Sequence, residues 1–319
     1  MAGDLFIGID LGGSGTRAAL ADADGAVLAI GRGPTGLLAR GGARRHLARA
    51  LDAALAPIAA QVGDAECAVF AGTRGLSVPG RRELLELELH TRFPGARIRV
   101  TNDALIGLWG GLGGEPGVAV LAGSGSIALA RNADGVEGRS GGWGYLLGDE
   151  GSGYWIGREA LRSYLRALEG RDHSSALHDF VRQRVGGKTV VEVLAWLYGG
   201  QDQVERLTGL APLVSQASEA GDLPAAEILA QAGRGLATMA ASATQQVSGA
   251  GTRVVRIGGV WSAPDALHAA FATRLHEVLP GAELVTPRLQ PVGGALLLAM
   301  GADHTAVDPR VVDRLALSL

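Results

Sequence analysis

The sequence predicts an α/β fold of two similar halves, because the same order of elements occurs twice along the chain. At 319 residues the chain exceeds the usual size of one domain, about 100 to 200 residues, so two hydrophobic cores are expected. Each half opens on a predicted hairpin with a glycine-rich loop, "DLGGSGT" in the first half and "AGSGSI" in the second. Two such halves would place both loops along one interdomain cleft, where ligands of α/β folds bind.

Three apolar runs near the start of the chain predict three antiparallel strands. The runs begin at Leu5, Thr16 and Ala26, and Asp24-Gly25 before the third run is typical of a hairpin turn. Alternating helices and strands follow: a helix around 47–58, a strand at 67–72, a helix at 81–92, a strand at 97–102 and a helix that opens at Asp103.

The second half repeats this order from Gly117. Two strands, and a third after the turn at 133–135, precede a long amphipathic helix that starts after Gly153. Helices dominate from about 203 to 248, and the last elements are a strand from 253, a helix from 264, a strand at 282–286 and a helix at 293–300. We therefore expect an N-terminal domain at 1–115, a C-terminal domain at 116–300, and a helix within 301–319 that packs back on the N-terminal domain.

Composition excludes several classes of function. A net charge of −3 with 47% hydrophobic and 19% charged residues is typical of a globular protein and argues against a nucleic-acid partner. No apolar run approaches the roughly 18 to 20 residues of a membrane span, and the N-terminus lacks a secretory pattern, so we expect a cytoplasmic protein without a membrane partner. The single cysteine, Cys67, rules out an internal disulfide or a multi-cysteine cluster, and its apolar strand predicts a buried thiol.

The first glycine-rich loop could hold phosphate groups. Gly12, Gly13 and Gly15 allow a tight turn whose backbone N–H groups point at an anion, and Asp10 ends the strand where a hydrated cation could bridge to phosphates. Taken alone, such a segment is more often an ordinary hairpin than a phosphate site, since it matches neither a Walker loop nor a dinucleotide fingerprint.

The second glycine-rich loop makes the phosphate interpretation stronger. It lies at the equivalent point of the second half, and the hydroxyls of Ser124 and Ser126 could contact phosphate or sugar oxygens. Two unrelated turns at equivalent points are a less economical explanation than one phosphate clamp shared by the two halves.

Asp103 directly follows a predicted strand and opens a helix, where an acidic residue often serves only as an N-cap. Here the preceding Asn102 already offers capping chemistry. The carboxylate of Asp103 is thereby available as a general base that takes the proton of a hydroxyl as the hydroxyl attacks phosphorus.

Together these segments resemble a known family. The segments "IGIDLGGSGTRAALAD", "TNDALIG", "AGSGSI", "GGWGYLLGDEGSGYWIG", "RIGGVWS" and "PVGGALLLAM" stand in the order typical of the N-acetylglucosamine kinase and glucosamine kinase branch of the actin-like ATPase superfamily. The resemblance extends from Phe6 to about Met300, and the segment from Gly141 to Gly157 is its most specific part. It implies two ribonuclease-H-like domains of mixed sheets flanked by helices.

The resemblance also implies an activity, namely ATP-dependent phosphorylation of the 6-hydroxyl of an amino sugar, most simply N-acetylglucosamine or glucosamine. Asp103 would be the general base, and Asp10 would position Mg²⁺ through water. ATP, Mg²⁺ and the amino sugar are the implied ligands, and relatives suggest a homodimer.

Binding residues carry over by position in the matching motifs. The implied sugar-binding residues are Asp103, Ser126, Gly142, Trp143, Gly144 and Asp149. The implied nucleotide-binding residues are Gly12, Gly13, Ser14, Gly123, Ser124, Gly125, Gly258 and Gly259. The glycines of "PVGGALLLAM" would allow close packing of a second interdomain helix at the hinge, although a plain core helix fits that segment too.

The chain departs from the family pattern near the expected sugar site. Relatives usually carry an asparagine in the loop after the third strand, where this chain has Thr35 or Gly36, and Ile127 replaces an asparagine found in some animal members. The sequence thus supports phosphoryl transfer better than it supports sugar specificity.

Two alternatives share the fold. An ATPase activator that holds an iron–sulfur cluster would need cysteines that this chain lacks, since it has Cys67 alone. A non-catalytic sugar or nucleotide sensor would be expected to have lost Asp10 or Asp103, and both are present.

Overall fold

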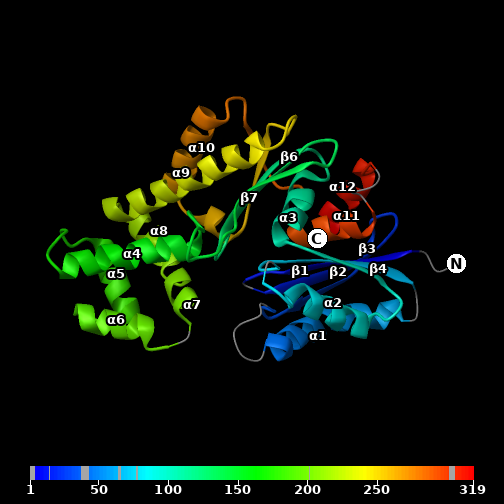
Figure 1. Cartoon of the computed structure of the whole chain (residues 1–319), viewed down its shortest axis with the longest axis horizontal. Helices are drawn as coiled ribbons and strands as arrows, with labels where there is room; N and C mark the ends of the chain where they lie inside the picture. The colour runs from blue at the N-terminus through cyan, green and yellow to red at the C-terminus, as the bar shows by residue number, and fades with distance from the viewer. Residues whose placement is uncertain are drawn as a thin grey trace.

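The computed structural model describes residues 4–13, 15–36, 43–63, 66–76, 78–200, 202–301 and 306–319. They form two five-stranded mixed sheets, each flanked by helices (Figure 1). In each sheet the first three strands are antiparallel, and the first strand pairs in parallel with the fourth, which pairs in parallel with the fifth. This confirms the predicted α/β fold of two similar halves.

The first sheet has the strand order β3-β2-β1-β4-β5. Its strands are β1 (Leu5–Leu11), β2 (Thr16–Asp22), β3 (Val27–Gly33), β4 (Cys67–Thr73) and β5 (Arg97–Thr101). One face packs on α1 (Ala43–Val62) and α2 (Arg81–Arg92), through apolar side chains that include Ile7, Leu51 and Leu89. Cys67 is buried in this core, as predicted.

The second sheet has the strand order β10-β9-β6-β7-β8. Its strands are β6 (Gly117–Ala122), β7 (Ser126–Arg131), β8 (Glu137–Gly141), β9 (Arg253–Ile257) and β10 (Glu283–Val285). The helices that follow β8 are α4 (Gly153–Leu168), α5 (Ala176–Val185), α6 (Val190–Tyr198), α7 (Gln203–Thr208), α8 (Ala211–Glu219), α9 (Leu223–Gln245) and, after β9, α10 (Asp265–Val278). Helices α4 to α7 extend beyond the sheet on the left of Figure 1.

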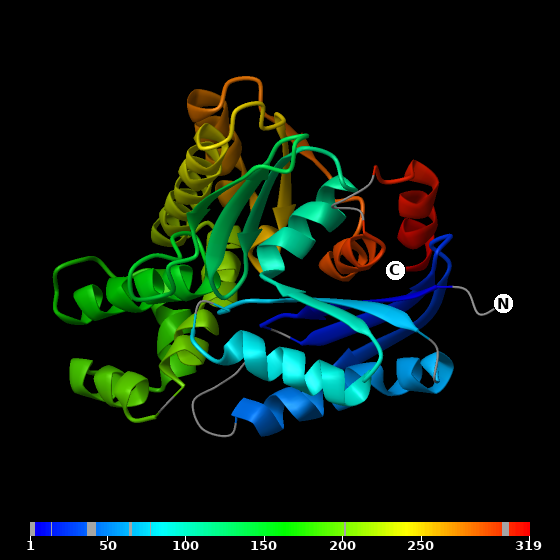
Figure 2. The same cartoon turned by 45° about the vertical axis from the view of Figure 1, so that its right-hand side comes forward.

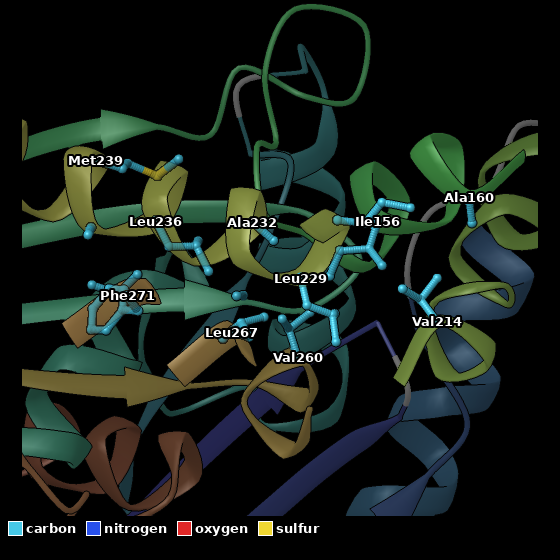
Figure 3. Packing of buried hydrophobic residues seen from close by; sticks show 14 of the residues in the cluster. Ile156, Ala160, Val214, Leu229, Ala232, Leu236, Met239, Val260, Leu267 and Phe271 are labelled. Atoms are coloured by element: carbon cyan, nitrogen blue, oxygen red, sulfur yellow. The ribbon is translucent and has the colours of Figure 1, made fainter. Parts of the chain in front are cut away.

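The largest core lies between the second sheet and its helices. Leu229 and Leu236 project from α9 toward α10, which contributes Leu267 and Phe271 (Figure 3). Met239 of α9 lies instead against Gly141 of β8, where a Cβ would come within 2.6 Å of its sulfur. These five side chains are buried, so their removal from water contributes strongly to the stability of the C-terminal half.

Two helices join the sheets. Helix α3 (Asp103–Leu112) leaves the first sheet but packs on the second, because a Cβ on its Gly107 or Gly111 would meet the side chains of Leu121, Val255 and Ile257. Helix α11 (Pro291–Ala299) follows the second sheet but packs on the first, beside α3 (Figure 2). Each sheet is therefore covered by a helix from the other half of the chain.

The final helix, α12 (Pro309–Ser318), lies against the first sheet and α11. Val312 and Leu315 are buried in one cluster with Phe6 and Ala19. The guanidinium of Arg314 donates to the carbonyl oxygen of Asp24 in the turn between β2 and β3, at 3.3 Å. The domain limits at residues 115 and 300 stay predictions.

The register of the parallel strands brings three loops to one edge of the first sheet. Leu11 of β1 lies opposite Thr73 of β4, and Gly72 lies opposite Thr101 of β5. The three strands therefore end together, and the segments that follow them leave the sheet at the same edge. In the second sheet, Leu121 lies opposite Ile257, so the segments after β6 and β9 also start side by side.

His178 on α5 is a buried structural histidine. Its Nδ1 accepts a hydrogen bond from the backbone N–H of Ser175 at 3.0 Å, so the ring proton is on Nε2, which lies 2.9 Å from the hydroxyl oxygen of Ser163. A histidine that donates to a serine oxygen cannot take the serine proton, so this pair is no nucleophile and base.

We expect the free energy of unfolding to decrease as the pH falls below 6.5, because burial lowers the pKa of His178 from its ordinary value of 6.5. Just below that pH the unfolded chain binds the proton and the folded protein does not. The contribution of neutral His178 is thus complete above 6.5 and is lost as the pH falls toward the lower pKa of the folded state. The free energy of unfolding is measured in urea at pH 7.5 and pH 5.5. It should decrease less between these pH values in His178→Gln than in wild type, whereas exposed His173→Gln should show the same decrease as wild type. An equal decrease in all three proteins would contradict the role of His178.

Among the described residues, no helix is long and apolar enough to cross a membrane.

Candidate active site at the junction of the two sheets

Three charged residues at or just after the ends of β1, β4 and β5 meet at the shared edge of the first sheet. Asp10 is the penultimate residue of β1, Arg74 directly follows β4, and Asp103 is the first residue of α3. The electrostatic influence of Asp103 is felt at both Asp10 and Arg74, which places the three charges close together. Sequence analysis identified the two carboxylates and missed the arginine.

Asn102 and Asp103 divide the roles at the start of α3 as predicted. The side-chain oxygen of Asn102 accepts a hydrogen bond from the backbone N–H of Leu105 at 2.8 Å, so Asn102 caps the helix. The Asp103 carboxylate is therefore not needed as the cap. Burial raises the pKa of Asp103, opposed by the charge of Arg74 and by the N–H groups at the helix start. A raised pKa brings a carboxylate closer to the pH at which it could exchange a proton.

The pKa of Asp10 is raised from 3.8 to about 7, first by burial and second by repulsion from Asp103, while Arg17 lowers it. A divalent cation beside the two carboxylates would remove this repulsion. No group of three or more His, Cys, Asp or Glu side chains suited to a metal occurs in the described part of the chain. A single carboxylate such as that of Asp10 can hold Mg²⁺ together with water and phosphate oxygens, which is how this ion is usually bound beside nucleotides.

The first glycine-rich loop closes on itself and touches its neighbours. The N–H of Gly12 donates to the carbonyl oxygen of Gly15 at 3.0 Å, and the hydroxyl of Thr35 donates to the carbonyl oxygen of Gly12 at 3.1 Å. A Cβ on Gly13 would lie 3.1 Å from the Ser124 hydroxyl oxygen, so the two predicted loops come together here across the junction of the sheets. The predicted nucleotide contact Ser14 lies outside the described residues.

The loop after β3, where Thr35 or Gly36 stands in place of the expected asparagine, is thus attached to the first glycine-rich loop. Besides the bond from Thr35, the hydroxyl of Thr16 donates to the carbonyl oxygen of Pro34 at 2.9 Å. Gly36 packs on Leu11, because a Cβ there would lie 3.0 Å from a Leu11 methyl group. In the described residues, therefore, this loop supports the glycine loop.

The second glycine-rich loop has the same internal bond, from the N–H of Gly123 to the carbonyl oxygen of Gly125 at 2.9 Å. A Cβ on Gly125 would lie 2.9 Å from a carboxylate oxygen of Asp149, so glycine is required for this approach. A Cβ on Gly123 would meet nothing within 4 Å, which leaves open space beside the loop. The hydroxyl oxygen of Ser124 accepts a hydrogen bond from Arg74.

Asp149 is held in an unusual conformation beside this loop. It has a φ of 62°, and among the described residues it is alone outside glycine in having a positive φ. Its carboxylate accepts a hydrogen bond from the backbone N–H of Ser126 at 3.1 Å, and it is 8% exposed. Burial raises the pKa of Asp149, while the Ser126 N–H and Arg74 lower it. A left-handed non-glycine residue that is also buried and charged is typical of a functional site.

Ser126 is hydrogen-bonded at both its side chain and its backbone to the segment that follows β8. Its hydroxyl donates to the carbonyl oxygen of Glu150 at 2.8 Å, and its own carbonyl oxygen accepts from the N–H of Gly142 at 3.0 Å. The sugar contact by Ser126 remains a prediction, and the structure adds a role for Ser126 in holding the segment from Gly142 to Glu150 to β7.

The segment from Gly141 to Gly148 forms an exposed apolar surface next to Asp149. Gly142 and Gly144 have φ values of 69° and 83°, which a side chain would strain. Trp143 is 67% exposed, and Leu146 and Leu147 are exposed as well. A tryptophan that only fills a core would be buried, whereas the exposed ring of Trp143 could stack on a ligand.

The turn after β9 is built partly for packing and partly for space. Gly258 has a φ of 110°, and a Cβ there would lie 2.4 Å from the carbonyl oxygen of Ala122. Gly259, which opens a short 3₁₀ helix (Gly259–Ser262), has nothing within 4 Å of a Cβ position. Space beside Gly259 fits the predicted adenosine contact, whereas close strand packing is sufficient to explain Gly258.

Two arginines that sequence reasoning missed complete the site. The charges of Asp103 and Asp149 act on Arg74. Arg139 donates to the carbonyl oxygen of Gly142 at 2.8 Å and lowers the pKa of Asp103. The sequence does contain a signal for Arg74, because a charged residue directly after a fully buried strand is the same feature that pointed to Asp103 after β5. The signal for Arg139 was absent, since it lies inside a strand among ordinary surface residues.

Comparison with known proteins agrees with this arrangement. The chain is 29% identical over 299 residues to the N-acetylmuramic acid/N-acetylglucosamine kinase of Clostridium acetobutylicum, covering 92% of this chain and 97% of that protein. It is 29% identical over 317 residues to the N-acetyl-D-glucosamine kinase of Dictyostelium discoideum, covering 95% of this chain and 99% of that protein.

A solved structure gives the same result. The crystal structure of a protein assigned as a candidate N-acetylglucosamine kinase from Chromobacterium violaceum superposes with a TM-score of 0.74 at 32% identity, covering 92% of this chain and 98% of that one. These relatives confirm the resemblance to the N-acetylglucosamine kinase branch. The model of the BadF/BadG/BcrA/BcrD ATPase family matches residues 7–299. Because the match spans most of the sequence, the chain belongs to the BadF/BadG/BcrA/BcrD ATPase family.

Proposed function

We propose that the protein is an ATP-dependent kinase that transfers the γ-phosphoryl group to the 6-hydroxyl of an amino sugar, N-acetylglucosamine or glucosamine. The observation that carries this proposal is the position of Asp103, a buried carboxylate that is not needed as the helix cap and that acts on the charge of Arg74, which touches the glycine loops of both halves of the chain. A base next to paired phosphate loops is the arrangement that phosphoryl transfer to a hydroxyl needs.

The chain's own residues would act in a defined order. The loops at Gly12 to Gly15 and at Gly123 to Gly125 would hold the phosphates, and the base and ribose would lie in the space beside Gly259. Asp103 would accept the proton of the 6-hydroxyl as its oxygen bonds to the γ-phosphorus. The bond from phosphorus to the β,γ-bridging oxygen breaks, and its electron pair leaves with ADP.

Asp10 would hold Mg²⁺ through water, and a cation there would offset the repulsion between Asp10 and Asp103. When bound, the ion would neutralise phosphate charge.

Sugar recognition would fall to the segment after β8. Asp149 would accept hydrogen bonds from sugar hydroxyls, Gly142 and Gly144 would let the backbone approach the ring, and the exposed indole of Trp143 would cover an apolar part of the ligand. The homodimer suggested by the resemblance remains a prediction.

Release of ADP from Mg-ATP tests this function. Purified protein is assayed with N-acetylglucosamine, glucosamine, N-acetylmuramic acid, N-acetylmannosamine, glucose or no sugar, and the position of the new phosphate is read by NMR. We expect strong stimulation by one amino sugar and slow hydrolysis without sugar. Hydrolysis that ignores every sugar would favour the activator alternative, and binding without turnover would favour a sensor.

We expect Asp149→Asn to weaken sugar binding by about 10- to 100-fold with a smaller change in kcat, because a charged hydrogen bond contributes about 1.5–3 kcal/mol. Asparagine is preferable to alanine here because it tolerates the left-handed conformation and can still accept from the Ser126 N–H. The sugar dissociation constant is measured by calorimetry. Glu150→Gln, at the exposed next position, is the matched control, and equal affinities for both variants would remove Asp149 from the pocket.

A further inference from the structure

The contacts of Arg74 within the described residues do not explain why a positive charge lies at this place. Its guanidinium donates to the hydroxyl oxygen of Ser124, and within the described residues it makes no other hydrogen bond and no ion pair. It is partly buried, and burial lowers the pKa of Arg74 although two carboxylates raise it. None of its nitrogens is a buried atom without a partner, so the donors that Arg74 does not use for Ser124 are accessible to a ligand.

The residues around Arg74 indicate which ligand its guanidinium would bind. A Cβ on Gly13 would lie 3.2 Å from a terminal nitrogen of Arg74, so the guanidinium rests against the first glycine loop. It contacts the second loop through Ser124, and Asp103 and Asp149 both act on its charge. The guanidinium therefore stands between the two phosphate loops, the proposed base and the proposed sugar carboxylate.

Resting on the proposed function, we propose that Arg74 is a catalytic residue that binds the γ-phosphoryl group of ATP during its transfer to the sugar. In this reaction the bond from oxygen to phosphorus forms as the bond to ADP breaks, and negative charge is spread over the three γ-oxygens. The fork of guanidinium donors matches two such oxygens at once, which an ammonium group cannot do. Because Arg74 comes from the first domain and touches a loop of the second, its contact with the phosphoryl group also depends on correct placement of the two halves.

The contact with the γ-phosphoryl group can be measured without any sugar. Calorimetry compares binding of Mg-ADP with binding of the Mg complex of a non-hydrolysable ATP analogue, AMPPNP. We expect Arg74→Gln to weaken AMPPNP binding about tenfold and to change ADP binding less than twofold, since only AMPPNP carries a γ-phosphoryl group. Exposed Arg97→Gln, at the far end of β5, should bind both nucleotides as wild type does.

Turnover supplies the second measurement. We expect Arg74→Gln to lower kcat about 100-fold, as loss of one donor to developing charge does in other enzymes, and Arg74→Lys to recover only part of it. Arg74→Ala should regain activity when guanidinium ion is added, whereas Asp103→Asn should not. Rescue also shows that the variant is folded.

The outcomes separate this inference from the proposed function. An unchanged AMPPNP to ADP affinity ratio in Arg74→Gln, or wild-type kcat in that variant, would overturn the role of Arg74 and leave the kinase intact. If no sugar stimulates ATP turnover by the wild-type protein, the kinase fails, and a reduced AMPPNP to ADP affinity ratio in Arg74→Gln would still support Arg74 as the γ-phosphoryl contact.

Discussion

Asp103→Asn should lower kcat by about 10²- to 10⁴-fold while leaving sugar and ATP affinities within a few-fold of wild type. That range is what a positioned general base contributes, and asparagine keeps the size of the side chain but cannot take the hydroxyl proton. Helix α3 should remain intact because Asn102 provides its cap. The measurement is steady-state ADP release with the best sugar, together with calorimetry for both ligands.

Asp265→Asn is the matched control for this substitution. Asp265 is also the first residue of a helix, α10, but it is exposed and away from the junction of the sheets. It should keep its activity and lose at most about 1 kcal/mol of stability through the helix dipole. If Asp103→Asn behaved like Asp265→Asn, Asp103 would be a helix-start residue and no base.

The second large effect is expected at Gly294, where α11 crosses α3. A Cβ at this position would lie 1.9 Å from the carbonyl oxygen of Ile106 and 2.4 Å from the backbone nitrogen of Gly110. Backbone atoms cannot rotate away, so Gly294→Ala should separate the two helices and lower the free energy of unfolding by about 3 kcal/mol. The shift should also displace Asp103 at the start of α3 and reduce kcat at temperatures where the variant is folded.

Gly235→Ala separates this packing effect from helix propensity. Gly235 lies inside α9, and its nearest neighbour to a Cβ would be a side-chain atom of Glu150 at 3.4 Å, an ordinary contact. Alanine there should be neutral or stabilising by up to about 1 kcal/mol, since alanine favours helix over glycine. Urea unfolding of both variants is the measurement, and similar stabilities would contradict the close crossing at Gly294.

The crossing also explains the segment "PVGGALLLAM" better than either of its two sequence interpretations alone. Helix α11 is a core helix, as its buried leucines show, and Gly294 also allows backbone contact with α3. Since α3 covers the second sheet and α11 the first, their contact is the point through which movement of one half would reach the other. The proposed function implies that the two halves close on their ligands, and the activity of Gly294→Ala would test this closure.

Much of the fold was predictable because it follows from local pattern. The strands, the hairpin turns and the helices α1, α2, α3 and α9 to α11 lie where apolar periodicity and turn residues predict them. The capping of α3 by Asn102 was predictable too, since both partners lie within four residues. The resemblance of the motifs then led to the family that the comparisons confirm.

The chain by itself therefore determined most of its elements, though not α5 and α6, together with its repeated halves and the position of Asp103 between a strand and a helix. Only the tertiary structure decided that α3 and α11 exchange sheets, that Asp149 turns left-handed onto the second loop, and that Arg74 stands between both loops. The physical reason is range: periodicity and capping act within a few residues, whereas strand register and backbone contact join residues that are dozens to hundreds of positions apart.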